Sequence, residues 1–271
     1  MNNQYLQKYQ AQTLRACQLK QIEILDEIDA VCRRHNIPYW LDAGTLLGAV
    51  RHGGFIPWDD DIDIGMNTED VERFLEVAPQ ELPPHLFVQT PENEPTKEPL
   101  VKVRDLNSFF VEGGDNFQAP YEKGVYVDIF PFVTFPNVSR GFIRKVTRSI
   151  ARSNSILGKA HYYSFRAFAE FFWFGSKLLL FKAIWSVACL LFPASKSKVT
   201  GYRVINNGFG NSHLKSSLWP LGTIMFEGKE YPAPADVDTY LKDLFHDYMQ
   251  VPPPEKRIIH SVFFMPTLLK E

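Results

Sequence analysis

The sequence predicts an α+β fold, in which a small mixed β-sheet is flanked by helices and followed by an additional, mainly helical C-terminal part. Three observations support this class. Short β-branched and aromatic runs alternate with helical patterns before residue 132, six prolines interrupt residues 79–99, and the chain becomes basic and strongly apolar after Arg140. For the 271 residues, we expect a core with an N-terminal helix over residues 1–135 and a mainly helical region over residues 136–271, packed on the core.

The first elements follow from spacing. Apolar residues recur every three or four positions from Leu14 to Cys32, which predicts an amphipathic helix of five or six turns that ends before Pro38. Residues 39–41 predict a short strand, and residues 45–51 a compact helix. His52-Gly53-Gly54 ends that helix, because glycine readily takes positive φ.

Five further elements complete the expected core. Polar and β-branched residues alternate over 61–64, which predicts a strand with one wet face, and Asn67 is placed to cap the next helix. Residues 86–89, 100–103 and 126–130 predict three more short strands. We expect Pro131 to close the last of them, because proline lacks a backbone N–H.

The C-terminal part predicts helices of unusual character. Basic residues recur at helical spacing from Arg140 to Arg152, and a heavily apolar stretch, residues 165–192, follows. Lys177 and Lys182 interrupt that stretch, so its longest charge-free piece is shorter than the roughly 20 residues of a membrane span. Two interpretations stay open: helices packed on the core, which we favour, or helices lying in a membrane interface. Residues 237–249 predict one further short helix.

Composition excludes several classes of protein. Lys plus Arg total 29 and Asp plus Glu total 31, and this balance argues against a nucleic-acid-binding protein held by its overall field. The three cysteines, Cys17, Cys32 and Cys189, form no CxxC pair, which argues against a disulfide scaffold and against a cysteine zinc site. The polar N-terminal segment lacks the apolar core of a signal peptide, so we expect a cytoplasmic protein.

Four carboxylates fall within five positions, at Asp59, Asp60, Asp61 and Asp63. Residues two apart in a strand share a face, so Asp61 and Asp63 are expected to project together. Paired carboxylates on a rigid strand suit Mg²⁺ or Mn²⁺, which keep waters and take further oxygens from phosphates. A calcium loop would need glycine where this chain has Ile64. An acidic turn that caps a helix remains the structural alternative.

A candidate phosphate-binding turn lies about 16 residues before these carboxylates. Gly44 and Thr45 stand where a strand gives way to a helix, and backbone N–H groups at such a point can cradle a phosphate. The sequence has neither the GxGxxG of a dinucleotide fold nor a Walker A loop.

A Gly-Thr turn followed by Asp-Ile-Asp is similar to the signature of the nucleotidyltransferase fold. The longer string LDAGTLLGAVRHGGFIPWDDDIDIGM, residues 41–66, resembles the LicD family of phosphocholine transferases, whose eukaryotic relatives include fukutin and fukutin-related protein. The resemblance continues in VKVRD at 101–105, VDIFPF at 127–132 and YLKDLFHDYMQVPPP at 240–254. It implies a nucleotidyltransferase-like core, with residues 136–271 on the acceptor side.

The resemblance also implies an activity. Such enzymes transfer phosphocholine from CDP-choline to a sugar hydroxyl of a cell-surface glycan, such as lipopolysaccharide or teichoic acid. The implied partners are CDP-choline and a glycan or lipid-linked glycan acceptor. The basic spacing over Arg140–Arg152 and the aromatic stretch after it separately predict a peripheral contact at the inner membrane face, and the charge balance predicts no nucleic-acid partner. Asp61 and Asp63 match the family's metal carboxylates, and Asp128 is the candidate for the third ligand and for the general base. Asp42, Asp59 and Asp60 are alternative candidates for these roles.

Donor-binding residues are expected around this centre. Gly44, Thr45, Arg51, Lys102 and Arg104 are the candidates for the diphosphate, since Lys102 and Arg104 share a strand face. A quaternary ammonium needs aromatic walls, and Trp58 is the main candidate, with other nearby aromatic residues at Trp40, Phe55 and Tyr121. Transfer of another phospho-group or of a nucleotidyl group, or a non-catalytic, divalent-ion-dependent glycan-binding protein, remain alternatives.

Overall fold

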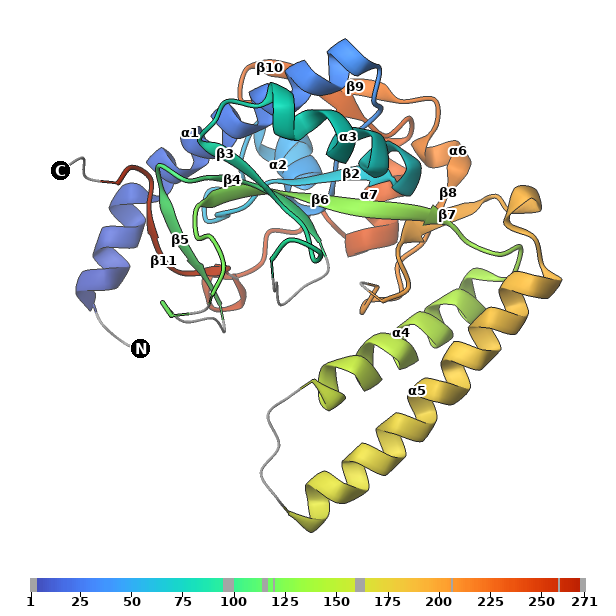
Figure 1. Ribbon diagram of the computed structural model, residues 1–271. Coiled ribbons are helices and arrows are strands. Elements are labelled where there is room, and N and C mark those ends of the chain that lie inside the picture. The colour runs from blue at the N-terminus through green and yellow to red at the C-terminus, as the bar shows by residue number, and fades with distance from the viewer. Residues whose placement is uncertain are drawn as a thin grey trace. The chain divides into compact units, whose positions relative to one another are not determined.

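The sheet of the computed structural model has its strands in the order β1-β2-β6-β4-β3 (Figure 1). Their bounds are β1 Trp40–Leu41, β2 Asp63–Asn67, β3 Leu86–Gln89, β4 Val101–Asp105 and β6 Val125–Thr134. The structure describes residues 4–94, 100–113, 117–118, 120–158, 164–205, 207–257 and 259–268. The chain divides into one unit of Met1–Pro131, Leu221–Pro234 and Phe245–Glu271, and another of Phe132–Pro220 and Ala235–Leu244. The predicted α+β class is confirmed.

Three helices flank the sheet of the first unit: α1 Gln4–His35, α2 Ala43–His52 and α3 Thr68–Glu81. The stripe predicted on α1 is buried, with Leu25 and Ile28 fully inaccessible, and α1 contacts both α3 and β4. The helix starts at Gln4 and is therefore longer than five or six turns. Gly53 ends α2 with φ of 70°, as its sequence predicts, and its N–H bonds to the carbonyl of Ala49.

Pro131 does not close β6, contrary to the prediction. Residues 125–129 of β6 pair with β4, whereas residues 132–134 pair with β7. Pro131 falls at the point where the strand changes partner. No ladder hydrogen bond is required of its nitrogen there, so the strand continues through it.

Two further pairs of antiparallel strands were not predicted from the sequence. Strand β5 (Phe109–Glu112) pairs with the C-terminal β11 (Ser261–Met265), and β9 (Gly222–Phe226) pairs with β10 (Lys229–Ala233). Glu227, in the β9–β10 turn, accepts hydrogen bonds from the Arg15 guanidinium and the Phe55 backbone N–H. The short 3₁₀ turn η2 (Pro254–Lys256) precedes β11. Segments from the end of the chain thus complete the first unit.

The second unit contains the helices α4 Arg140–Leu157, α5 Phe165–Leu191, α6 Lys215–Leu218 and α7 Val237–Phe245, the 3₁₀ turn η1 Ala194–Lys196, and the strands β7 Val199–Tyr202 and β8 His213–Leu214. Phe135, Ile143 and Val199 form a small buried core, against which Trp185 packs. The helix predicted over residues 237–249 ends at Phe245, and His246 takes a positive φ of 58°.

Helix α5 does not have the burial of a core helix. Among its residues that the structure describes, only Ala188 is buried. Lys177 and Lys182 lie inside one uninterrupted helix of 27 residues. By length and composition this helix is able to cross a membrane, a test that some helices of soluble proteins also pass.

Candidate active site

Asp59, Asp60 and Asp61 form a loop before β2 that we call the acidic loop. Two buried glutamine side chains of α1 hold its backbone. Gln18 donates to the carbonyl oxygen of Asp59 over 2.9 Å, and Gln21 donates to that of Asp60 over 2.7 Å. The buried side of α1 therefore includes two polar residues, and their hydrogen bonds hold the acidic loop in place.

Gly44 and Thr45 hold the same segment from α2. A Cβ atom on Gly44 would lie 2.9 Å from Oδ2 of Asp59, so only glycine leaves room for this carboxylate. The hydroxyl of Thr45 accepts the backbone N–H of Asp63 over 2.8 Å. The structure thus places both residues of the predicted phosphate cradle against the acidic segment.

The backbone at the start of α2 is unusual. Asp42 caps the helix, and its carboxylate accepts the N–H of Ala43 over 2.8 Å. Ala43 has φ of 39°, in the left-handed region that non-glycine residues rarely adopt. Such conformations persist where the surroundings impose them, often at functional sites. Here the N–H of Asp42 donates to the carbonyl of Asp63, which ties this turn to β2.

Asp128 on β6 is brought to the same place by a backbone bond. Its N–H donates to the carbonyl of Ile62, the residue between Asp61 and Asp63, over 2.8 Å. Ile62 and Ile64 are fully buried, as the alternation predicts. The predicted metal ligands Asp61, Asp63 and Asp128 therefore lie on neighbouring backbone segments of the first unit. Of these three, only Asp61 belongs to the described group of potential ligand atoms that lie within 4.8 Å of one another.

Burial and mutual repulsion dominate the electrostatics of this cluster. Desolvation, reinforced by Asp61, raises the pKa of Asp59 to about 8. Desolvation also raises the pKa of Asp63, with Asp61 and Asp128 as the next largest causes, and raises the pKa of Asp128 to about 6. Like charges in a low-dielectric site are unfavourable unless a cation lies among them. The donor set therefore fits a hard divalent cation.

His260 is a member of the site that no feature of the sequence indicated. Its Nδ1 lies 3.1 Å from a carboxylate oxygen of Asp61, and hydrogen bonding to Asp60 is the main cause that raises its pKa to about 9. Potential ligand atoms of Asp59, Asp60, Asp61 and His260 all lie within 4.8 Å of one another. His260 follows Asp60 by 200 positions, and only the pairing of β11 with β5 brings it here.

The carboxylate of Asp60 is hydrogen-bonded to the backbone of the C-terminal segment. Its two carboxylate oxygens accept the N–H groups of His260 over 2.9 Å and Ser261 over 2.8 Å, and its side chain is fully buried. His260 and these bonds lower the pKa of Asp60 despite its burial. Asp60 therefore fastens the C-terminal segment to the acidic loop, whereas Asp59 and Asp61 keep oxygens for other partners.

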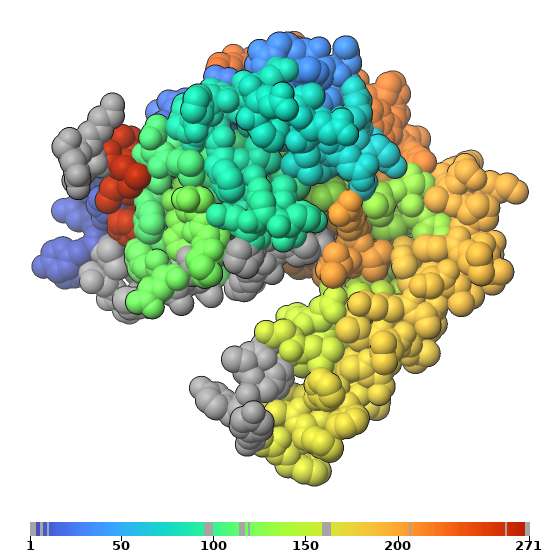
Figure 2. Space-filling view, viewed as in Figure 1, coloured from blue at the N-terminus to red at the C-terminus, as the bar shows by residue number. Residues whose placement is uncertain are grey.

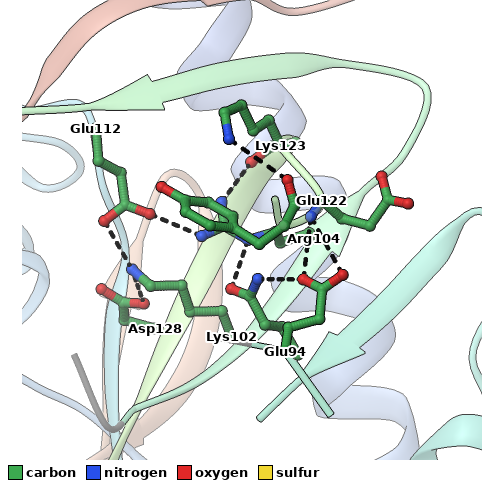
Figure 3. A network of polar contacts seen from close by, with 10 residues as sticks. Glu94, Lys102, Arg104, Glu112, Glu122, Lys123 and Asp128 are labelled. Atoms are coloured by element: carbon green, nitrogen blue, oxygen red, sulfur yellow. Dashed lines mark hydrogen bonds and ion pairs between the residues drawn. The ribbon is translucent and has the colours of Figure 1, made fainter. Parts of the chain in front are cut away.

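Lys102 and Arg104 on β4 enter a network around Glu112 (Figure 3). The ammonium of Lys102 lies 2.8 Å from Asp128 and 3.3 Å from Glu112, and it stands 3.8 Å above the ring of Tyr126. The two cations do share one face of the strand, as the alternation predicts. Glu112, which the sequence did not indicate, bridges them.

Arg104 uses its guanidinium fully within the protein. Nε donates to the side chain of Gln89, Nη1 to the carbonyl of Gly124 and Nη2 to Glu112. Gln89 in turn donates to Glu94, which also accepts the backbone N–H of Glu122 (Figure 3). The side chain of Arg104 is 1% exposed, so the network runs from Asp128 through a buried arginine to Glu94 and the exposed Glu122.

Arg51 and Trp58 lie near the C-terminal segment of the first unit. Arg51 donates to the carbonyl of Tyr248 over 2.9 Å. The guanidinium of Arg257 lies 4.0 Å from the ring of Trp58, and His52 meets the same ring edge-on. Trp40 and Phe55 are buried, and Trp40 packs against Gly65. Tyr121 is half-buried, and the ammonium of Lys123 lies 3.8 Å from the centre of its ring.

Comparisons with known proteins give the family. Residues 36–168 match the model of the LicD/FKTN/FKRP nucleotidyltransferase domain. Lipopolysaccharide cholinephosphotransferase LicD of Haemophilus influenzae is 38% identical over 128 residues, 46% of this chain and 46% of that protein. Human ribitol 5-phosphate transferase FKRP is 41% identical over 101 residues, 35% of this chain and 17% of that protein. The aligned part thus spans less than half the length of these relatives. Residues 36–168, which include every predicted site residue, therefore form a LicD-family nucleotidyltransferase domain.

Proposed function

We propose that this protein is a phosphotransferase that moves phosphocholine from CDP-choline to a sugar hydroxyl of a cell-surface glycan. The observation that carries the proposal is the cluster of buried carboxylates with raised pKa values beside the ammonium of Lys102. Its similarity to LicD, named for cholinephosphotransfer to lipopolysaccharide, supports the transferred group and the acceptor class.

Asp61, Asp63 and Asp128 would hold Mg²⁺ or Mn²⁺. Hard oxygen donors are the ligands these ions prefer. Burial is the main cause that raises the pKa of Asp63, and a cation would relieve the further rise that comes from repulsion by Asp61 and Asp128. His260 lies close enough to Asp61 to hold that carboxylate in place. When bound, the ion supplies Lewis-acid stabilisation of charge on the diphosphate.

The remaining chemistry belongs to side chains of the chain itself. The acceptor hydroxyl oxygen attacks the phosphorus of phosphocholine, the bond to the bridging oxygen breaks, and cytidine monophosphate leaves with that oxygen. Asp128 accepts the proton of the hydroxyl, and a pKa of about 6 suits a base at neutral pH. Lys102 exchanges its contact with Glu112 for the oxygens of the diphosphate.

Trp58 is the proposed wall for choline. Its ring already holds a cation, the guanidinium of Arg257, at 4.0 Å. A quaternary ammonium cannot donate a hydrogen bond and is recognised on aromatic faces. Choline would therefore displace Arg257 from Trp58. Residues 136–271 are proposed as the acceptor side and the cytoplasm as the location, which the unpaired cysteines support.

The test is an assay of the full chain with CDP-choline, Mg²⁺ and a lipopolysaccharide or teichoic acid acceptor. We expect release of cytidine monophosphate and transfer of choline label to the glycan, both reduced at least about 100-fold in Asp61→Asn and Asp63→Asn. Glu76→Gln, on the exposed face of α3, is the matched control and should keep full activity.

The choice of label separates the alternatives. Because FKRP is named a ribitol 5-phosphate transferase, CDP-ribitol is assayed in parallel. Turnover of CDP-ribitol alone would overturn phosphocholine as the transferred group. Cytidine label in the glycan would identify nucleotidyl transfer instead. Divalent-ion-dependent glycan binding without turnover of either donor would overturn the enzymatic proposal.

A further inference from the structure

The charge of this protein is strongly segregated between its two units. The chain as a whole has a formal net charge of −2. The second unit contains fourteen basic and four acidic residues, a net charge of +10, so the first unit has −12. Between Asp128 and Glu227, Glu170 is the only acidic residue. The second unit is therefore suited to an anionic partner, although the chain average conceals this.

The α4–α5 pair combines this charge with an exposed apolar surface. Helix α5, drawn in yellow to orange in Figure 2, packs against α4 on one side, yet Ala188 is the only buried residue among those of α5 that the structure describes. Aromatic residues gather in its first three turns, where Phe172 is 55% and Trp173 69% exposed. The large exposed apolar side chains of the helix are Phe165, Phe168, Phe171, Phe172, Trp173, Leu179, Leu180, Val187, Leu190 and Leu191. Ten large apolar side chains exposed on one helix exceed the single scattered ones that are normal on a soluble surface, and such a concentration marks an interaction site.

Helix α4 provides the positive charge. It has five basic residues and no acidic one. Its apolar side, which includes Ile143, Val146 and Ile150, is buried, and α4 contacts α5 along the hairpin. Its exposed side displays Lys145 and Arg152. Apolar and cationic surfaces thus occur together on one helical hairpin, the combination that suits an anionic bilayer surface.

The positions of the charges favour a hairpin lying in the membrane interface over a spanning helix. A span of about 20 residues within α5 would place Lys177 or Lys182 near the bilayer centre, where an ammonium is costly. Because α4 packs against α5, a spanning α5 would also bring the basic residues of α4 into the hydrocarbon core. In the interface, long lysine side chains reach the headgroups while aromatic residues enter the acyl boundary.

We propose that the α4–α5 hairpin docks the protein on the surface of an anionic phospholipid bilayer, with the exposed aromatic residues in the first turns of α5 inserted and the basic residues at the headgroups. Docking is a property separate from the transfer reaction. It is measured without donor or acceptor, so its failure and the failure of the proposed function are distinguishable.

The experiment is flotation of the full chain with vesicles. We expect binding to phosphatidylglycerol–phosphatidylethanolamine vesicles that is at least tenfold stronger than to phosphatidylcholine vesicles, and at least tenfold weaker at 0.5 M than at 0.05 M salt. Lys145→Glu with Arg152→Glu should lower binding at least tenfold. Lys8→Glu with Lys256→Glu makes the same charge change on exposed residues of the first unit and should leave binding within twofold.

A second pair of variants tests the apolar part. Phe172→Ser with Trp173→Ser should lower binding at least tenfold, whereas Tyr5→Ser, an exposed aromatic residue of α1, should not. Circular dichroism identifies variants that fail to fold. Equal binding to neutral and anionic vesicles, resistance of the bound protein to alkaline carbonate, or self-association through α5 without vesicle binding would each overturn the proposal.

Discussion

The ammonium of Lys102 lies 2.8 Å from the carboxylate of Asp128, its direct partner across the β4–β6 pair. This contact opposes burial. Desolvation raises the pKa of Asp128 to about 6, and the charge of Lys102 lowers it from the still higher value that burial alone would give. Lys102 thus keeps Asp128 ionised at neutral pH, as a metal ligand or a base must be.

Lys102→Met should therefore move the acidic limb of the pH–activity profile. A carboxylate with a raised pKa loses its charge as the pH falls through that value, so wild-type activity should decline below about pH 6. Without the ammonium the pKa rises further, and the limb should move up by at least about one pH unit. The measurement is kcat/KM for release of cytidine monophosphate between pH 5 and 9. Lys20→Met, which removes an ion pair with Asp105, should leave the limb in place.

Asp60→Asn should destabilise the protein. The wild-type carboxylate accepts two backbone N–H groups, and an amide offers only one oxygen. Leaving one buried donor unsatisfied costs about 1–3 kcal/mol of unfolding free energy. Because the pKa of Asp60 is lowered by folding, its stabilisation is present above the ordinary carboxyl pKa and is lost as the pH falls through the lowered value.

Urea denaturation at pH 7 measures this effect, with Glu76→Gln as the exposed control. The difference in free energy of unfolding between Asp60→Asn and the wild type should become smaller as the pH falls toward 3. An unchanged denaturation midpoint at pH 7 would show that the C-terminal segment is not held by Asp60.

Asp59→Asn should have the opposite effect on stability. The pKa of Asp59 is raised to about 8 by burial and by Asp61, so ionisation of this group disfavours the folded state as the pH rises from about 4 to 8. The neutral amide removes this penalty. In EDTA at pH 8, the free energy of unfolding of the variant should therefore exceed that of the wild type by at least about 1 kcal/mol.

Divalent cations should stabilise the folded protein. An ion that binds only the folded state stabilises it by about 1.4 kcal/mol at ten times its dissociation constant. Wild-type protein should therefore gain thermal stability from Mn²⁺ or Mg²⁺, and Asp61→Asn and Asp63→Asn should gain little. The unfolding temperature with and without the ion is the measurement. Equal gains in the wild type and both variants would place the ion elsewhere.

The local part of the site was predictable because it is short-range. Alternation over Asp61–Ile64 fixes which side chains face the interior, and the same alternation on β4 puts Lys102 and Arg104 on one face. The position of Gly44 where β1 gives way to α2 was also predictable. Its close approach to the carboxylate of Asp59 was not, because that approach depends on the path of the acidic loop.

The long-range part was not predictable from spacing. His260 reaches Asp61 only because β11 pairs with β5, and nothing in a neutral tail segment indicates that pairing. Glu112 was missed for a similar reason, because a single carboxylate at the end of a short strand is ordinary. Pro131 misled the prediction, because the rule that proline ends a strand assumes one pairing partner on each side, whereas β6 exchanges β4 for β7 there.

Arg104→Lys distinguishes a structural role from donor binding. The sequence predicts that Arg104 contacts the diphosphate, whereas its three nitrogen atoms donate to Gln89, Gly124 and Glu112 inside the protein. Lysine retains the charge but cannot make these three bonds, so unfolding free energy should fall by about 3 kcal/mol or more. Below the unfolding temperature the KM for CDP-choline should stay within about twofold of the wild type. Lys102→Arg, by contrast, retains a charge beside Asp128 and should alter the KM with little loss of stability. A raised KM with an unchanged denaturation midpoint in Arg104→Lys would assign Arg104 to the donor.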